Sequence, residues 1–181
     1  MAATSGSQNT FMPKRQIYDQ EQHAQFVTFS CYHRRRLLDC EPLRDALIES
    51  LAEKITKYSG ICSGYVIVPD HVHAIVWFEA KGELSRFMKS WRQSTSQELK
   101  RMLRGVAPEY AKIIPPADLL WQPRYHPFNV YSQKKAEEKL DYMHKNPVTA
   151  GLVERAVDWK WSSARHYLLN EPNVVPLEWI F

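Results

Sequence analysis

Two histidines separated by one residue, His71 and His73, have the spacing to do chemistry as a pair. They open an apolar, β-branched run over residues 71–78, which is typical of a β-strand. Successive side chains of a strand point to opposite faces at about 3.3 Å per residue, so both imidazoles project to one side. Val72 and Ala74 are expected to face the other side, toward a core. The histidine pair is therefore either a metal site or two structural histidines.

Tyr142 is the second candidate, because it stands on the polar face of a predicted helix over residues 132–146. That helix opens on a capping serine, and Pro147 is expected to end it. At 100° per residue, Tyr142 lies about 200° from Leu140 on the apolar face. Asn146 follows one turn later. This tyrosine is either an ordinary surface residue or a phenolic nucleophile beside an ion that Asn146 helps to bind.

The composition bounds the class of protein. With 181 residues, 44% of them hydrophobic, the chain can bury one core and is too short for two ordinary domains. Its formal charge of +4 permits a nucleic-acid partner without requiring one. The three cysteines show no CxxC spacing, which indicates free thiols in a reducing compartment. No apolar run reaches the ~18 residues of a membrane span, and no secretory signal is recognisable, so a cytoplasmic protein is expected.

Hydrophobic periodicity predicts a single domain in which strands alternate with helices. We expect strands at residues 25–32, 61–68 and 71–78. We expect amphipathic helices at residues 43–58, 82–104 and 132–146. Pro69 and Asp70 form a turn signal between two of the strands, which are therefore expected to pair as a hairpin.

The segments between these elements carry weaker signals. Residues 106–119 contain three prolines and no periodicity, so a connecting loop is expected there. Residues 120–130 are extended and aromatic, and their prolines favour an edge strand or a structured arm. Residues 150–181 are expected to wrap the core as an irregular tail. The domain is then expected to span residues 16–181, after a flexible arm over residues 1–15.

Four segments together resemble a known family. Residues 69–73 (Pro-Asp-His-Val-His) resemble the histidine–hydrophobic–histidine signature of the single-tyrosine HUH transposases. Residues 142–153, which begin at Tyr142, resemble their catalytic-tyrosine segment. Residues 120–124 and 158–163 are similar to flanking signatures of one branch, the REP-associated tyrosine transposases, which are related to the transposases of single-strand-transposing insertion sequences. The segments occur in the family's order and at compatible spacing.

The resemblance implies a ferredoxin-like α+β fold, in which an antiparallel sheet carries the histidines and helices pack on it. It implies that Tyr142 is the catalytic nucleophile and that His71, His73 and Asn146 bind a divalent metal ion. Two imidazoles and a carboxamide oxygen form a mixed, fairly hard ligand set, which favours Mg²⁺ or Mn²⁺. The implied activity is cleavage and transfer of single-stranded DNA at hairpin-forming palindromic repeats, through a covalent 5′-phosphotyrosine intermediate.

Asp70 departs from the family pattern, where asparagine is common. We expect its carboxylate to point away from the histidine face. His144, two residues after Tyr142, faces away from the polar side of its helix and is assigned a structural role.

The partner implied by the resemblance is hairpin or single-stranded DNA. Exposed basic residues would contact its backbone, and an aromatic residue would stack on a base. The candidates are Lys14, Arg15, Arg34, Arg86, Lys89, Arg92, Trp121, Arg124 and Lys135. A monomer is expected. Two alternatives stay open at this point, a nucleic-acid hairpin-binding protein that keeps the fold without catalysis and a metal-dependent hydrolase without a covalent step.

Overall fold

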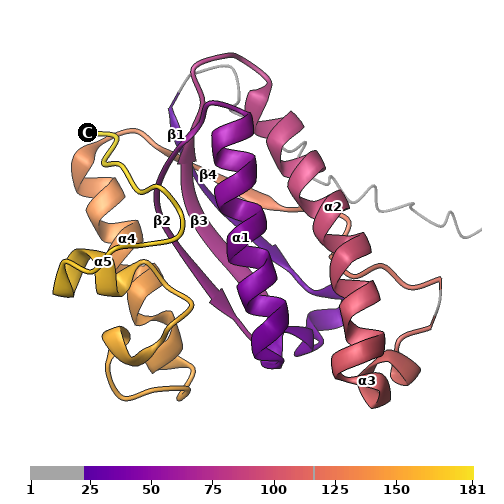
Figure 1. The fold of residues 1–181 in the computed structure, drawn as a ribbon. Coiled ribbons are helices and arrows are strands. Elements are labelled where there is room, and N and C mark those ends of the chain that lie inside the picture. Colours follow the sequence, from indigo (N-terminus) through magenta and orange to yellow (C-terminus); the bar gives the residue numbers. More distant parts are fainter. Residues whose placement is uncertain (1–22, 116) are drawn as a thin grey trace, which may run out of the picture.

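A four-stranded antiparallel sheet forms the centre of the computed structural model, which describes residues 23–115 and 117–181. The strands are β1 (Ala24–Ser30), β2 (Ile61–Val68), β3 (His71–Trp77) and β4 (His126–Val130), in the spatial order β2-β3-β1-β4. Along the chain, one long helix lies between β1 and β2, and a second long helix followed by a short one lies between β3 and β4 (Figure 1). This order is that of a ferredoxin-like fold, so the predicted α+β class is confirmed.

The hairpin predicted at residues 69 and 70 joins β2 to β3. Val68 stands opposite His71 at its closed end. Strand β1 pairs with the other side of β3, where Thr28 lies opposite His73 and Ser30 opposite His71. The two histidines therefore occupy a strand with a neighbour on both sides, and strand alternation places both on one face of the sheet.

Two long helices cover the opposite face. These are α1 (Glu41–Lys57) and α2 (Glu83–Val106), which lie side by side in front of the sheet in Figure 1. The β3 residues on this face, Val72, Ala74 and Val76, are fully buried. Burial of such a continuous apolar layer is the main favourable term in folding, so this side holds the principal core predicted from the alternation.

The helix α4 (Gln133–Thr149) packs on the histidine face, next to β2 and away from α1 and α2 (Figure 1). It begins as predicted at Ser132, whose hydroxyl accepts the backbone N–H of Lys135. The prediction that Pro147 ends the helix is wrong, because α4 continues to Thr149. A proline in the last turn removes one backbone hydrogen bond, and Gly151, with a φ of 67°, then allows the chain to turn away.

Two further expectations are wrong in part. The loop expected at residues 106–119 contains the short helix α3 (Pro108–Ile113), with its proline in the first turn, where no hydrogen bond is lost. The tail expected to be irregular contains α5 (Ala164–Leu169) and a 3-10 turn (Ala156–Asp158). Both helices are six residues long, too short for periodicity to reveal.

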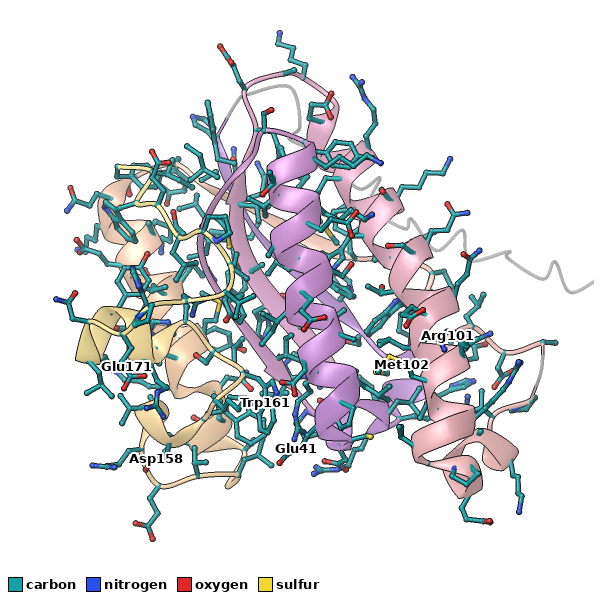
Figure 2. The ribbon with its side chains drawn as sticks, in the orientation of Figure 1. Glu41, Arg101, Met102, Asp158, Trp161 and Glu171 are labelled. Atoms are coloured by element: carbon teal, nitrogen blue, oxygen red, sulfur yellow. The ribbon has the colours of Figure 1, made fainter. Side chains whose placement is uncertain are left out.

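The tail does wrap the core, through its tryptophans. Trp161 lies beside the first turn of α1, where Figure 2 labels it near Glu41. The guanidinium of Arg44 lies 3.6 Å from the Trp161 ring centroid, and the Trp161 indole donates to Asp45. Trp159 donates to the Ile67 carbonyl of β2. None of the helices within residues 23–115 and 117–181 is long and apolar enough to cross a membrane.

Candidate active site

The imidazoles of β3 face each other at the edge of a cavity. The Nε2 atoms of His71 and His73 lie 3.0 Å apart, and the rings are nearly perpendicular at 82°. His73 is 4% exposed, and its ring stacks on Phe26 of β1 at a centroid distance of 5.0 Å. The pair is thus fixed by the sheet and by one flanking ring.

The Nδ1 atom of each imidazole has its own hydrogen-bond partner. His71 Nδ1 lies 2.7 Å from an Asp70 carboxylate oxygen, and His73 Nδ1 lies 2.7 Å from the hydroxyl of Thr28. An imidazole that donates from Nδ1 keeps a lone pair on Nε2, which is the arrangement of a metal-binding histidine. The expectation that Asp70 points away is therefore wrong. The other carboxylate oxygen of Asp70 accepts a hydrogen bond from Arg34 Nε at 2.8 Å, so the carboxylate is held between His71 and Arg34.

Both imidazoles are held in their neutral form. Burial lowers the pKa of His73 to about 3, and the positive charges of His71, Arg34 and Lys139 add to the effect. Burial also lowers the pKa of His71, against the opposing influence of the Asp70 carboxylate. A neutral imidazole is the form that binds a metal ion, so neither histidine needs to lose a proton at neutral pH.

Helix α4 brings Tyr142 and Asn146 to the same place. The Tyr142 ring centroid lies 5.6 Å from that of His73, and the residue is 53% exposed. The Asn146 amide nitrogen lies 3.4 Å from His73 Nε2, and rotating the carboxamide by half a turn would place its oxygen there instead. With His71, these two residues line a cavity of about 410 Å³. The side chains of the four predicted site residues, His71, His73, Tyr142 and Asn146, therefore lie next to one another.

Close packing positions α4 against β2. At Gly64 of β2, a β-carbon would come within 2.5 Å of the Leu140 side chain and 2.9 Å of Met143. His144 adds a polar anchor, since its Nε2 lies 2.8 Å from the hydroxyl of Ser163. The structural role predicted for His144 is confirmed.

The residues present fit a divalent cation. A separation of 3.0 Å between two Nε2 atoms matches two adjacent ligands, each about 2.1 Å from one ion. No group of three His, Cys, Asp or Glu side chains could hold a metal within the described residues. The Asn146 amide, 3.4 Å from His73 Nε2, is placed to add an oxygen ligand beside the two imidazoles.

The structure separates the predicted DNA-binding residues. Arg86, Lys89 and Arg92 lie on α2, across the sheet from the histidines, so they do not border this cavity. Arg86 pairs with Glu83 at 3.0 Å. Arg92 donates to the carbonyls of Gln122 and Pro123 and so supports the segment before β4.

The other predicted DNA contacts differ in how open they are. Trp121 is 4% exposed, and its indole donates to Thr95, so its ring is not open to a base. Arg34 forms an ion pair with Asp70 at 2.8 Å. Arg124 is exposed, and Lys135 pairs with its neighbour Glu138 on α4. Lys14 and Arg15 lie outside the described residues.

Two lysines of the site were missed by the sequence reasoning. Lys139 lies one turn before Tyr142, and its ammonium is 5.9 Å from the tyrosine ring centroid. Lys145 lies one turn after Tyr142 and lines the cavity together with Thr149. Residues three positions apart on a helix are neighbours, so counting three in both directions from Tyr142 would have found both lysines.

Comparison with known proteins identifies the family. Residues 19–146 match the family model described as IS200-like transposase, which is more than half of the chain. The chain belongs to the IS200-like transposase family. It is therefore an enzyme of the transposase class, as the four sequence segments predicted. Among curated proteins, none matches the sequence.

Two solved structures resemble this transposase. One is a REP-associated tyrosine transposase bound to a REP hairpin, which is 19% identical, with a TM-score of 0.62 and 94% of each chain covered. The other is a candidate transposase from Deinococcus radiodurans R1, which is 16% identical, with a TM-score of 0.48 and coverage of 66% of this chain and 87% of that one. The first likeness establishes the fold.

Proposed function

We propose that this transposase cleaves and rejoins single-stranded DNA at hairpin-forming palindromic repeats, with Tyr142 as the nucleophile. The observation that carries the proposal is that Tyr142 and Asn146 from α4 share one cavity with His71 from β3, while the buried His73 lies directly behind, 3.0 Å from His71 Nε2 and 3.4 Å from the Asn146 amide. A purely structural role would not require an exposed tyrosine, an amide and a neutral imidazole to share one solvent-open cavity.

The metal ligands in this proposal are His71, His73 and Asn146. A bound Mg²⁺ or Mn²⁺ would supply positive charge to a non-bridging oxygen of the scissile phosphate. Asp70 and Thr28 hold the imidazoles in the tautomer that leaves Nε2 free. Three protein ligands would leave room for the substrate.

The chemical step belongs to the phenol of Tyr142. Its oxygen forms a bond to phosphorus as the bond from phosphorus to the 3′-oxygen breaks, and that oxygen leaves as a 3′-hydroxyl. The phenolic proton passes to solvent, to which the side chain is open, and the leaving 3′-oxygen takes up a proton from solvent. One phosphodiester is exchanged for another, so a 3′-hydroxyl of a second strand reverses the reaction without an external energy source.

The proposed partner is a DNA hairpin with unpaired bases at its foot. In support, the fold is that of a transposase whose structure holds a REP hairpin. One chain supplies all four site residues, so the site is complete without a second copy. We therefore propose a monomer whose residues 16–181 act as one catalytic domain.

A trapping assay tests the proposed function. The protein is incubated with Mn²⁺ and a panel of hairpin oligonucleotides with single-stranded feet, and a denaturant-resistant protein–DNA adduct is sought on a gel. Wild-type protein should form the adduct, Tyr142→Phe should abolish it, and Tyr131→Phe should leave it unchanged, since Tyr131 is an exposed tyrosine outside the cavity.

The other outcomes point to other functions. Cleavage that persists in Tyr142→Phe would instead indicate a metal-dependent hydrolase without a covalent step. Hairpin binding without any processing, in wild type and His71→Ala alike, would indicate a binding protein that keeps the fold.

A further inference from the structure

Lys139 is held in an unusual position for a helix lysine. Its ammonium lies 4.3 Å from the ring centroid of Phe128 and 5.1 Å from that of Phe26. Both rings belong to neighbouring strands of the sheet, where they stand opposite each other in register. A ring face attracts a cation without cancelling its charge. The two rings therefore place a full positive charge beside Tyr142.

The nearby carboxylates are occupied with other lysines. Glu138 pairs with Lys135, and Asp141 lies 3.8 Å from Lys145. Within the described part of the chain, no carboxylate lies within ion-pair distance of Lys139. Among the described carboxylates, therefore, none competes with an external anion for this ammonium.

The ring beneath this lysine is itself open. Phe128 is 41% exposed on β4, an edge strand of the sheet. A partly exposed aromatic ring beside a cation is a combination that single-strand binding proteins use, with the ring stacking on a base and the cation contacting the backbone.

We propose that Lys139 and Phe128 form a nucleotide subsite beside Tyr142, in which Lys139 binds a backbone phosphate and Phe128 stacks on the adjoining base. The inference rests on the proposed function for its substrate, single-stranded DNA. The Lys139 ammonium lies 5.9 Å from the Tyr142 ring centroid. A phosphate bound to Lys139 would therefore lie close to the phosphate that Tyr142 attacks.

The salt dependence of DNA binding tests the subsite. The probe is a fluorescent dT15 strand, because stacking subsites tolerate any base, and affinity is measured by anisotropy at several salt concentrations. Each phosphate contact with a single strand contributes about 0.7 to the slope of log K against log salt. Lys139→Met keeps the alkyl stem and removes the charge, so the slope should become less steep by about 0.7. Lys139→Arg should restore the slope.

Two further variants sharpen the test. Phe128→Leu should weaken dT15 binding by about tenfold, because a stacking ring is lost. Its slope should stay near wild type, because stacking involves no counterion release and the Phe26 ring still lies 5.1 Å from the Lys139 ammonium. Lys134→Met is the matched control, since it removes an exposed α4 charge outside the cluster, and it should leave both quantities near wild type. Melting temperatures close to wild type establish that each variant is folded.

The outcomes separate this inference from the proposed function. A wild-type slope in Lys139→Met would overturn the subsite, whether or not the protein forms a covalent adduct. A reduced slope in that variant supports the subsite even if wild-type protein never forms the adduct, a result that would contradict the proposed cleavage alone. Where the adduct forms, Lys139→Met should also slow its formation by about tenfold, as expected for loss of one positioning contact.

Discussion

Replacing Gly64 by alanine should loosen the contact between the tyrosine helix and the histidine sheet. The backbone of Gly64 is one that alanine can adopt, so the effect is purely steric. The new methyl group would lie 2.5 Å from Leu140 Cδ1 and 2.9 Å from Met143 Cε, both far closer than van der Waals contact. It would also lie 3.1 Å from the hydroxyl of Ser163, which hydrogen bonds hold in place.

Overpacking of a core by one methyl group costs about 1–3 kcal/mol of the free energy of unfolding. For a chain of this size, each kcal/mol lowers the melting temperature by about 2–4 °C. We therefore expect Gly64→Ala to melt about 3–10 °C below wild type. Met143 is fully buried, so its side chain has little room to turn aside, and a shift of α4 that relieves the clash carries Tyr142 with it. A displacement of about 1 Å can slow a reaction by about 100-fold. The rate of adduct formation should therefore fall by more than the loss of folded protein alone would explain.

Thermal denaturation followed by circular dichroism measures the first effect, and the trapping assay measures the second. Gly105→Ala is the matched control, because a β-carbon at Gly105 of α2 meets nothing within 4 Å. Alanine favours a helix over glycine by up to about 1 kcal/mol, so this control should melt at or slightly above the wild-type temperature.

A second substitution tests the reasoning itself. Leu140→Ala removes the side chain that the new methyl group would strike. The double variant Gly64→Ala/Leu140→Ala should therefore lose less stability than the two single changes added together, by about 0.5–3 kcal/mol. Strict additivity, or a wild-type melting temperature in Gly64→Ala alone, would refute the view that this contact positions α4.

Three other perturbations have expected outcomes. Asp70→Ala should weaken Mn²⁺ binding, measured by calorimetry, by about 10–100-fold, because His71 loses the acceptor that orients it; unchanged affinity would contradict that orienting role of Asp70. His144 is buried, and burial lowers its pKa to about 4 from about 6.5 in the unfolded chain, so its contribution to stability is present above pH 6.5 and is lost as the pH falls toward 4. Between pH 6.5 and 5 this loss is on the order of 2 kcal/mol in urea denaturation, and His144→Gln should lack that part of the pH dependence. Trp121→Phe should cost about 1 kcal/mol of stability through the lost hydrogen bond to Thr95, and dT15 binding by the folded protein should stay unchanged; weaker binding would show that the indole reaches DNA after all.

Much of the local structure could be predicted from the sequence because it depends on neighbouring residues. Strand alternation alone puts His71 and His73 on one face, and a proline–aspartate turn makes the hairpin that presents them. The polar-face position of Tyr142 and the spacing to Asn146 likewise follow from helical geometry. These rules are short-range, so one sequence suffices to apply them.

Other features could not be predicted from the sequence, because they depend on contacts between distant residues. Trp121 was expected to be open to DNA, and it is buried against α2. The basic stripe at Arg86, Lys89 and Arg92 was expected to follow DNA, and its helix covers the face away from the cavity. Sequence periodicity identifies the buried side of a helix, but it does not say which face of a sheet that side will cover.

The sequence by itself determined the chemistry available to this transposase: a pair of imidazoles, a phenol and an amide, each on a predictable side of its own element. Only the tertiary structure decided that these groups meet, because their meeting depends on the packing of α4 on β2 at Gly64. It also decided which charges belong to the site. Whether a lysine pairs with a carboxylate or lies over two rings is set by residues far away in the chain, as the position of Lys139 over Phe26 and Phe128 shows.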